Sequence, residues 1–387
     1  MLLLYFKTKR SDGQIIADFG SLRRVWPTAA EGRVFFTVGS ARPYLSLNEQ
    51  RLILYEYKPY NNTFTRIIDL TNIDKLVNTS GKPFFKRNIG IFIPAWNSGF
   101  YIYGKTYFKI FHSENLTDFR TVYVDPSGTY GNHFFANDTG NIIGIGVGRG
   151  WKGKKGSISY TPLSSYLLIS EDYGESWLKI YELRYPTAIY DGVIVDDLIL
   201  FTARERKSVF FSTNKGKTFN EIRLDSPARN AAYFRIGRKE FIIISSNDSF
   251  YLSHLDNIKF KKIKLYTVGL VLRYPIFFQR KIFLSGVGVR SWLIAFDLKL
   301  GKVDKYDITI LAGDKSACRL AFSNNKFFIG SELYGKLYAI EPGSLRELRT
   351  KDYIKLYLSF LLNSMLKKYL CDFQEYHPFF KFYNSPC

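Results

Sequence analysis

Arginine recurs at one phase of this sequence, and guanidinium groups are well suited to bind carboxylates or phosphates in a two-pronged geometry. Four arginines follow one another at spacings of 45, 44 and 46 residues: Arg184, Arg229, Arg273 and Arg319. Arg24 and Arg87 occupy comparable places in earlier intervals, and His133 takes the place in the interval between. If the chain circles an axis with this period, we expect these side chains to line an anion-binding funnel. The alternative is that each arginine pairs locally with a carboxylate.

A second basic cluster lies in the sequence GRGWKGKKGS, residues 148–157. Its charged and aromatic side chains are Arg149, Trp151, Lys152, Lys154 and Lys155. Basic residues around one aromatic ring suit a phosphate backbone with a stacked base, or the face of a sugar. A solvated loop without a ligand is the alternative. The Gly-x-Gly-x-x-Gly match within it is no dinucleotide fingerprint, because neither a helix nor a βαβ unit follows.

The charge of the whole chain indicates the class of partner. Its 387 residues carry 55 Lys and Arg against 34 Asp and Glu, a formal net charge of +21 at pH 7. An excess of this size bears on partners and solubility rather than on fold. We therefore expect a polyanionic ligand, first an acidic glycan or surface receptor of the adhesin or virion-attachment kind, and second a nucleic acid. A generally basic surface without a specific partner is the alternative.

The sequence ISEDYGESW, residues 169–177, reduces to Ser170-x-Asp172-x-Gly174-x-x-Trp177. Such a set of residues either builds an active site or folds a turn. Asp and Ser side chains can accept and donate hydrogen bonds to the turn's own backbone, and Gly supplies a positive φ. Because folding accounts for all four residues, we expect a structural turn and do not assign Asp172 a catalytic role. Related skeletons recur at 212–219, 253–260 and 113–119.

Paired strand-like runs recur every 40 to 57 residues, which predicts a β-propeller. Tyr, Phe, Ile and Val are spread along the whole length and favour an all-β body. Seven intervals carry two strands followed by a hairpin: 22–70, 72–122, 128–181, 185–223, 228–264, 268–307 and 311–348. We predict seven blades of four antiparallel strands, with six or eight as alternatives. The remaining hairpin at 2–18 either closes the ring or begins an eighth blade.

The skeleton at 170–177 resembles the Asp-box, or BNR repeat, of sialidase-like β-propellers, and the skeleton at 212–219 is similar to it. This resemblance implies that the boxes form the turn between the third and fourth strands of a blade. It also implies that ligands bind at the opposite face, where the arginines and the 148–157 loop are expected.

Catalysis is the less favoured reading. Sialidases of the resembled class use three arginines, a Tyr–Glu pair and an Asp acid, and their first arginine lies in an Arg-Ile-Pro motif. Here the closest match is Phe92-Ile93-Pro94, and Tyr190 and Asp191 read equally well as inner-strand and turn residues. Glycoside hydrolysis needs two flanking carboxyl groups, which one sequence cannot pair. The four histidines are scattered and indicate neither a metal site nor a catalytic triad, so no cofactor is expected. A sialidase-like hydrolase remains the third alternative.

The period changes after the last blade. Residues 353–373 carry a helical apolar stripe, which predicts an α-helix that packs on the propeller or docks a protein partner. We therefore divide the chain into a propeller at 1–348 and a C-terminal helix and tail at 349–387. We find no signal peptide and no segment long enough to span a membrane. The compartment is left open, with the cell or virion surface and the cytoplasm as alternatives. Low Met, Cys and His contents are compatible with a heat-adapted source.

Overall fold

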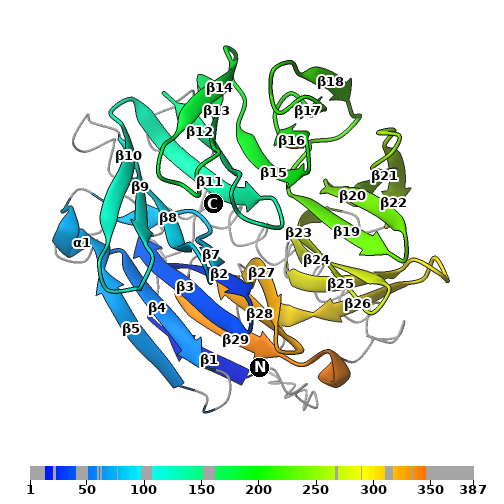
Figure 1. The fold of residues 1–387 in the computed structure, drawn as a ribbon. Helices are drawn as coiled ribbons and strands as arrows, with labels where there is room; N and C mark the ends of the chain where they lie inside the picture. The colour runs from blue at the N-terminus through cyan, green and yellow to red at the C-terminus, as the bar shows by residue number, and fades with distance from the viewer. Residues whose placement is uncertain are drawn as a thin grey trace, which may run out of the picture. The chain divides into compact units, whose positions relative to one another are not determined.

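The computed structural model describes residues 14–20, 23–40, 51–58, 61, 63–75, 77–96, 107–150, 162–265, 269–288, 290–309, 317–332 and 334–345. In this part of the chain, seven antiparallel sheets stand as blades around a common axis (Figure 1). The prediction of an all-β propeller with seven blades is confirmed. The predicted helix at 353–373 lies outside the described residues, as do Cys371, Cys387 and the whole tail, so the domain boundary stays a prediction.

In the first four blades the strands follow one another from the channel outward. Blade 1 contains β2 (Arg23–Ala30), β3 (Arg33–Ser40), β4 (Ile53–Lys58) and β5 (Thr63–Asp69), followed by the short helix α1 (Leu70–Ile73). Blade 2 contains β6 (Thr79–Ser80) and β7 (Phe84–Lys86), which both pair with β8 (Gly90–Trp96), then β9 (Phe108–Ser113) and β10 (Arg120–Asp125). Blade 3 contains β11 (Gly128–Ala136), β12 (Ile143–Arg149), β13 (Ser164–Ser170) and β14 (Leu178–Leu183). Blade 4 contains β15 (Ile189–Val195), β16 (Leu198–Ala203), β17 (Ser208–Ser212) and β18 (Asn220–Arg223).

The last three blades repeat this order, except that the ring closes in the seventh. Blade 5 contains β19 (Ala231–Ile236), β20 (Lys239–Ser245), β21 (Ser249–His254) and β22 (Lys261–Lys264). Blade 6 contains β23 (Val271–Phe278), β24 (Lys281–Val287), β25 (Ser291–Asp297) and β26 (Val303–Asp307). Blade 7 contains β27 (Ala317–Ser323), β28 (Lys326–Ser331), β29 (Lys336–Ile340) and, as its outer strand, β1 (Gln14–Asp18); a 3-10 turn, η2 (Pro342–Ser344), follows β29.

Strand β1 closes the ring. It pairs antiparallel with β29, with Asp18 opposite Lys336 and Gln14 opposite Ala339. Of the two roles left open for the N-terminal segment, the structure therefore shows closure of blade 7 and no eighth blade among the described residues. The first and last segments of the propeller are joined by backbone hydrogen bonds, and β1 covers the edge that β29 would otherwise expose.

Apolar side chains form one cluster between each pair of neighbouring blades. Successive residues of a strand point to opposite faces of its sheet. In β3, for example, Phe35 packs toward blade 2, whereas Phe36 packs toward blade 7. Both faces of each blade are therefore buried, which explains why the aromatic residues are distributed along the whole chain. No helix among the described segments is long and apolar enough to cross a membrane.

The box at 170–177 folds the turn between β13 and β14, as predicted. The backbone N–H of Gly174 donates to Ser170 Oγ at 2.7 Å, and that of Ser176 donates to Asp172 Oδ1 at 2.9 Å. The Trp177 Nε1–H donates to the carbonyl of Gly174 at 3.0 Å. The box at 212–219 repeats the two backbone-to-side-chain bonds between β17 and β18, with Asn214 in place of the aspartate and Phe219 in place of the tryptophan. These residues are occupied in folding the turn, which is the structural role expected for them.

Gly174 gives the first test of this turn. Its φ is +90°, and a Cβ on it would lie 2.3 Å from Cε1 and Cζ of the buried Phe92 ring in blade 2. We expect Gly174→Ala to lower the free energy of unfolding by about 2–4 kcal/mol, because backbone strain and overpacking add.

The matched control is Gly237→Ala, where φ is +61° and nothing lies within 4 Å of the added Cβ. Only the strain of about 1 kcal/mol is expected there. Equal losses for the two variants in urea denaturation would contradict the packing argument.

Candidate anion-binding site at the channel mouth

The innermost strands begin at the same end of the central channel and carry arginines there. Arg24, Arg273 and Arg319 lie within the first three residues of β2, β23 and β27, and Arg229 lies two residues before the start of β19. In two of these strands the pairing register shifts beside the arginine, between Arg273 and Ile276 in β23 and between Ala317 and Arg319 in β27. Such bulges turn a side chain out of the regular alternation. They help to aim these arginines into the channel rather than between the blades.

Glu332, in the β28–β29 loop, holds two of the arginines together. Its Oε1 accepts from Arg273 Nη1 at 2.9 Å and from Arg319 Nη2 at 3.3 Å. The Arg319 guanidinium also stacks on the Trp26 ring, at 3.6 Å from the ring centroid. Burial alone would raise the pKa of Glu332, but the charges of Arg273, Arg319 and Arg24 lower it to about 2. Glu332 is therefore a permanent carboxylate at neutral pH.

A second carboxylate lies across the channel. Glu205 Oε1 accepts from Arg204 Nε at 2.5 Å, and its Oε2 accepts from the backbone N–H of Ala188 at 2.7 Å. The Arg204 guanidinium lies 5.5 Å from the centroid of the Tyr190 ring. Burial, together with the like charges of Arg273 and Arg204, lowers the pKa of Arg229 to about 10. Arg229 is still charged at neutral pH, and it interacts electrostatically with Glu205.

We define the channel mouth as Arg24, Arg204, Arg229, Arg273, Arg319, Glu205 and Glu332. Five guanidinium groups face two carboxylates, so the set carries three uncompensated positive charges. Burial lowers the pKa of Arg24 most, and repulsion by Arg319 and Arg273 adds to this. Within the described residues, the set therefore carries an excess of positive charge.

Several buried hydrogen-bond donors at the mouth have no acceptor within the part of the chain that the structure describes. They are Nε of Arg24, Arg273 and Arg319 and Nε1 of Trp26. None of these nitrogens can accept a hydrogen bond. A buried donor without an acceptor costs about 1–3 kcal/mol. The mouth is therefore suited to a ligand that brings acceptor oxygens and negative charge.

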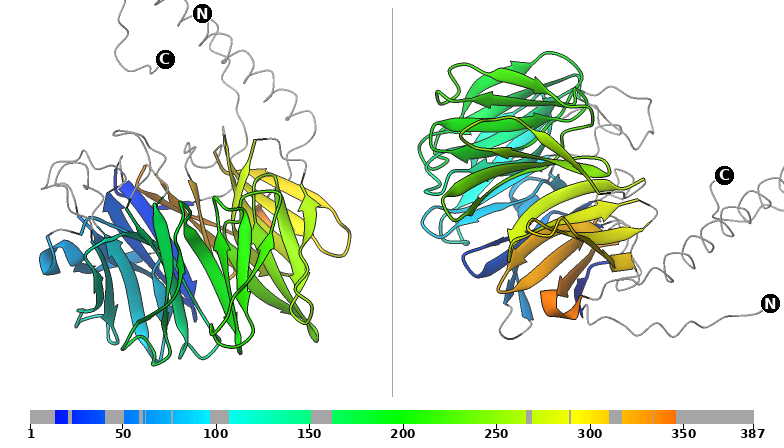
Figure 2. Two further views of the ribbon diagram at one scale, coloured as in Figure 1. Left: turned by 90° about the horizontal axis from the view of Figure 1, so that it is seen from above. Right: turned by 90° about the vertical axis from the view of Figure 1, so that its right-hand side faces the viewer.

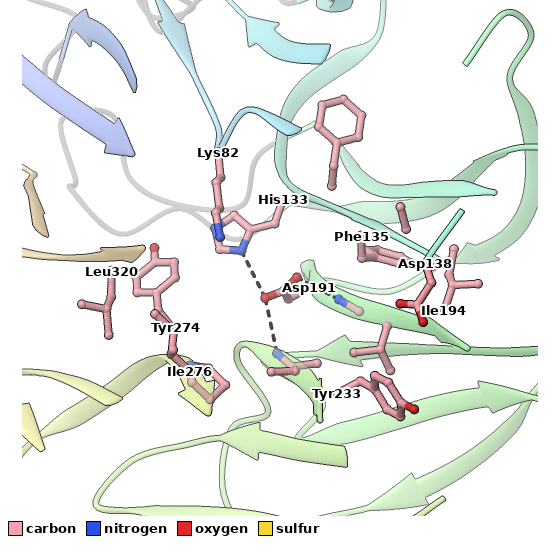
Figure 3. Close-up of a pocket in the computed structure, with 17 residues that line it drawn as sticks. Lys82, His133, Phe135, Asp138, Asp191, Ile194, Tyr233, Tyr274, Ile276 and Leu320 are labelled. Atoms are coloured by element: carbon pink, nitrogen blue, oxygen red, sulfur yellow. Dashed lines mark hydrogen bonds and ion pairs between the residues drawn. The ribbon is translucent and has the colours of Figure 1, made fainter. Parts of the chain in front are cut away.

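Beneath the mouth, a buried polar network ties blades 3, 4, 5 and 6 together. Asn230 Nδ2 donates to Asp191 Oδ2 at 3.0 Å and to His133 Nδ1 at 2.9 Å, and Asn230 Oδ1 accepts from the Tyr274 backbone N–H at 3.3 Å. Figure 3 shows Asp191 linked to His133 on one side and to the following inner strand on the other. The network fixes the positions of the inner strands relative to one another along the channel axis. It thereby also fixes the positions of the arginines at the mouth.

The same network lines a cavity of about 330 Å³ in the channel. Lys82 from blade 2 points toward His133 in this cavity (Figure 3). Burial lowers the pKa of Lys82, while the charge of Asp191 raises it. Burial also lowers the pKa of His133, so that its ring is neutral at pH 7. His133 thus lies in the channel wall, in the middle of β11 and beneath the mouth rather than among the arginines.

The structure brings together only part of the predicted set. Arg229, Arg273 and Arg319 meet at the mouth with Arg24. Arg184 does not join them: its side chain is 85% exposed and its Nε lies 3.4 Å from Glu182. Arg184 therefore follows the alternative considered for all of these arginines, which is local pairing with a carboxylate.

Arg87 and Arg149 also lie apart from the mouth. Arg87 follows its innermost strand instead of preceding it, because β7 ends at Lys86, and it pairs with Glu31 of the β2–β3 turn. It therefore lies at the opposite end of the channel, which corrects the expectation. Arg149, at the end of β12, donates to Asp125 Oδ2 and stacks on Tyr166. Trp151, Lys152, Lys154 and Lys155 lie outside the described residues, and their role in binding stays a prediction.

Sequence reasoning missed Arg204, Glu205 and Glu332. Both glutamates sit in loops between the second and third strands, in the sequences ARERK and GSELY. The strand period does not cover loop residues, so it gave no signal for them. Lys82 and Asn230 were missed because nothing in the sequence marks a polar residue as facing the channel.

Comparison with known proteins supports the propeller fold but does not assign the chain to a family. No family model matches the chain. A structure of YCF48 bound to a D1 peptide superimposes with a TM-score of 0.54 at 10% identity, over 85% of this chain and 94% of that one. Saccharomyces cerevisiae Sqt1 superimposes with a TM-score of 0.56 at 10% identity, over 86% of each chain. These similarities support the propeller fold alone, and the Asp-box and sialidase-like assignment stays a resemblance of the motif.

One curated protein shares a short stretch of sequence. A 67-residue segment, 17% of this chain, is 36% identical to the vacuolar protein sorting/targeting protein 10 of Schizosaccharomyces japonicus. The match spans only 4% of that much longer protein.

The depressed pKa of Glu332 predicts a pH dependence of stability. The carboxylate form stabilises the fold above the ordinary pKa near 4.5, and this contribution is lost as the pH falls toward about 2. At pH 7 we expect Glu332→Gln to cost about 2 kcal/mol, because it leaves two close guanidiniums without their carboxylate. The difference between wild type and variant, measured by denaturation from pH 7 to pH 3, should shrink below pH 4.5.

Glu341→Gln is the control, since Glu341 is 63% exposed and pairs with Lys326 at 3.2 Å. Its cost should stay below about 0.5 kcal/mol. A Glu332→Gln loss that is small, or that does not change with pH, would contradict the assigned role.

Proposed function

We propose that this chain is a non-catalytic recognition propeller that binds a negatively charged group of a partner at the channel mouth. The observation that carries the proposal is the excess of buried guanidinium donors over acceptors at one end of the channel. Bidentate guanidinium contacts to an oxyanion are among the stronger polar interactions in proteins.

The depth of the arginines restricts the shape of the ligand. The side chain of Arg273 is 18% exposed and that of Arg319 only 4%. A broad polyanionic surface such as duplex nucleic acid presents its phosphates on a convex backbone and would reach these groups poorly. A single protruding carboxylate, at a chain end or on an acidic side chain, can enter the recess.

A protein partner with an acidic or carboxyl-terminal segment fits this requirement best. YCF48, whose structure with a D1 peptide has the same fold, supports the idea that such a propeller can hold an extended peptide. An acidic glycan presents the same carboxylate or sulfate chemistry. It is therefore tested as a separate class of ligand in the binding experiment below.

The carboxylates of the mouth support a binding rather than a catalytic role. A glycosidase needs one carboxyl group that can give up a proton near neutral pH. The pKa of Glu332 is held at about 2, and Glu205 is engaged by Arg204 and by the backbone of Ala188. A general acid would require a raised pKa, and the lowered pKa of Glu332 is the opposite of this.

Binding can be tested with variants that leave both Glu332 ion pairs intact. We expect Arg24→Gln/Arg229→Gln to weaken binding of a fluorescent acidic peptide by about 10- to 100-fold, because charged hydrogen bonds are lost. Fluorescence anisotropy would measure this for the peptide with a free carboxyl terminus and for its amidated form.

Arg184→Gln is the matched control, since it removes an equally charged but exposed side chain, and affinity should change less than twofold. A heparin-type oligosaccharide and single-stranded DNA form the other two arms, each measured at two salt concentrations. If the double variant binds the peptide as wild type does, the mouth is not the site. If the double variant weakens binding of DNA or of the oligosaccharide but not of the peptide, the channel mouth is the binding site but the proposed class of partner is wrong.

A further inference from the structure

A second candidate site lies at the other end of the blades, between the β9–β10 turn and the β13–β14 turn. One ligand atom each from His112, Glu114 and Glu175 lie within 4.8 Å of one another. A cavity of about 690 Å³ borders the three residues. Figure 1 shows β9 and β10 of blade 2 beside β13 and β14 of blade 3, so the two turns come from neighbouring blades. In Figure 2, these blades stand side by side with their strands running along the ring axis.

His112 is prepared to act as a ligand. Its side chain is 1% exposed, and its ring stacks on Phe92 with centroids 4.1 Å apart and planes at 5°. Its Nε2 lies 2.6 Å from the carbonyl oxygen of Ile89. Since a carbonyl only accepts, Nε2 carries the proton and a neutral ring has its lone pair on Nδ1. That Nδ1 is buried and has no hydrogen-bond partner among the described residues.

The geometry of His112 matches a common arrangement in metal proteins. A metal-bound histidine almost always donates its other N–H to a carbonyl or carboxylate, which fixes the tautomer and the ring orientation. The carbonyl of Ile89 fills this role, and the stacked Phe92 holds the ring plane. A buried ring nitrogen without a partner calls for an explanation, and here two carboxylates lie close enough to share a bound ion with it.

Two glycines position the carboxylates. A Cβ on Gly90 would lie 2.1 Å from the carbonyl oxygen of Ser113 and 2.5 Å from Cα of Glu114, so only glycine lets these segments approach. Gly174 allows the box turn to lie against Phe92, the ring that stacks on His112. Glu175 follows Gly174 directly. The box turn, which is structural in itself, thus delivers a carboxylate to the neighbouring blade's histidine.

We propose that His112, Glu114 and Glu175 bind a divalent transition-metal ion of the zinc class, with water completing the coordination. One imidazole and two carboxylates form a ligand set that suits Zn²⁺. Two cations border the site. Lys86 donates to the carbonyl of Asp138, and Arg120 engages Oε1 of Glu175 and so competes with a metal for that carboxylate.

The test is titration of the full-length protein with Co²⁺, whose visible absorption reports coordination by nitrogen and oxygen, followed by displacement with Zn²⁺. We expect Glu114→Gln and Glu175→Gln each to weaken Co²⁺ binding by about 10-fold or more. Arg120→Gln should strengthen it several-fold, because it frees the Glu175 carboxylate. Glu114 and Glu175 are exposed in the turns and Arg120 is exposed at the start of β10, so the variants should fold.

Glu171→Gln is the matched control, because Glu171 lies exposed in the same box turn but outside the cluster. Its affinity should equal that of wild type. Binding that is absent in wild type up to millimolar Co²⁺, or that is unchanged in Glu114→Gln/Glu175→Gln, would overturn the proposal. The second result would assign the ion to other residues, such as the cysteines of the tail.

Discussion

The pairing of β1 with β29 is the constraint on which the rest of the structure depends. It closes seven blades into a ring, and only a closed ring brings the first residues of inner strands from Arg24 to Arg319 to one opening. Once these guanidiniums are neighbours, their mutual repulsion has to be offset. Glu332 and Glu205 offset part of it, and the Asn230 network below sets the heights of the strands that carry them.

The seven-bladed ring could be predicted from the sequence, but the arrangement of side chains at the channel mouth could not. The 40- to 57-residue period and the box turns predicted seven blades correctly, because both follow from strand and turn chemistry that is local. The period also indicated which arginines share a phase. It could not separate Arg273, which turns inward at a bulge, from Arg184, which ends in solvent beside Glu182, because that difference depends on pairing with a neighbouring strand. Arg87 was misplaced because blade 2 divides its inner strand into β6 and β7.

The box motif shows how a structural element can serve a second purpose. Ser170, Asp172, Gly174 and Trp177 satisfy one another and fold the turn. The side chain of Glu175, which takes no part in these bonds, reaches the neighbouring blade, where Arg120 engages it. The two ends of the propeller therefore differ in chemistry: one gathers guanidinium donors around the channel, and the other brings carboxylates toward a buried imidazole.

The central claim is that buried arginine donors at the mouth receive an anionic group. The most direct measurement is NMR of the arginine Nε–H groups in selectively labelled protein, recorded with and without an acidic peptide. The account predicts that the Nε–H signals of Arg24, Arg273 and Arg319 shift and exchange more slowly with solvent on binding, while those of Arg184 and Arg87 stay unchanged. Changes confined to Arg184 or Arg87, with the three mouth signals unmoved by a bound peptide, would contradict it.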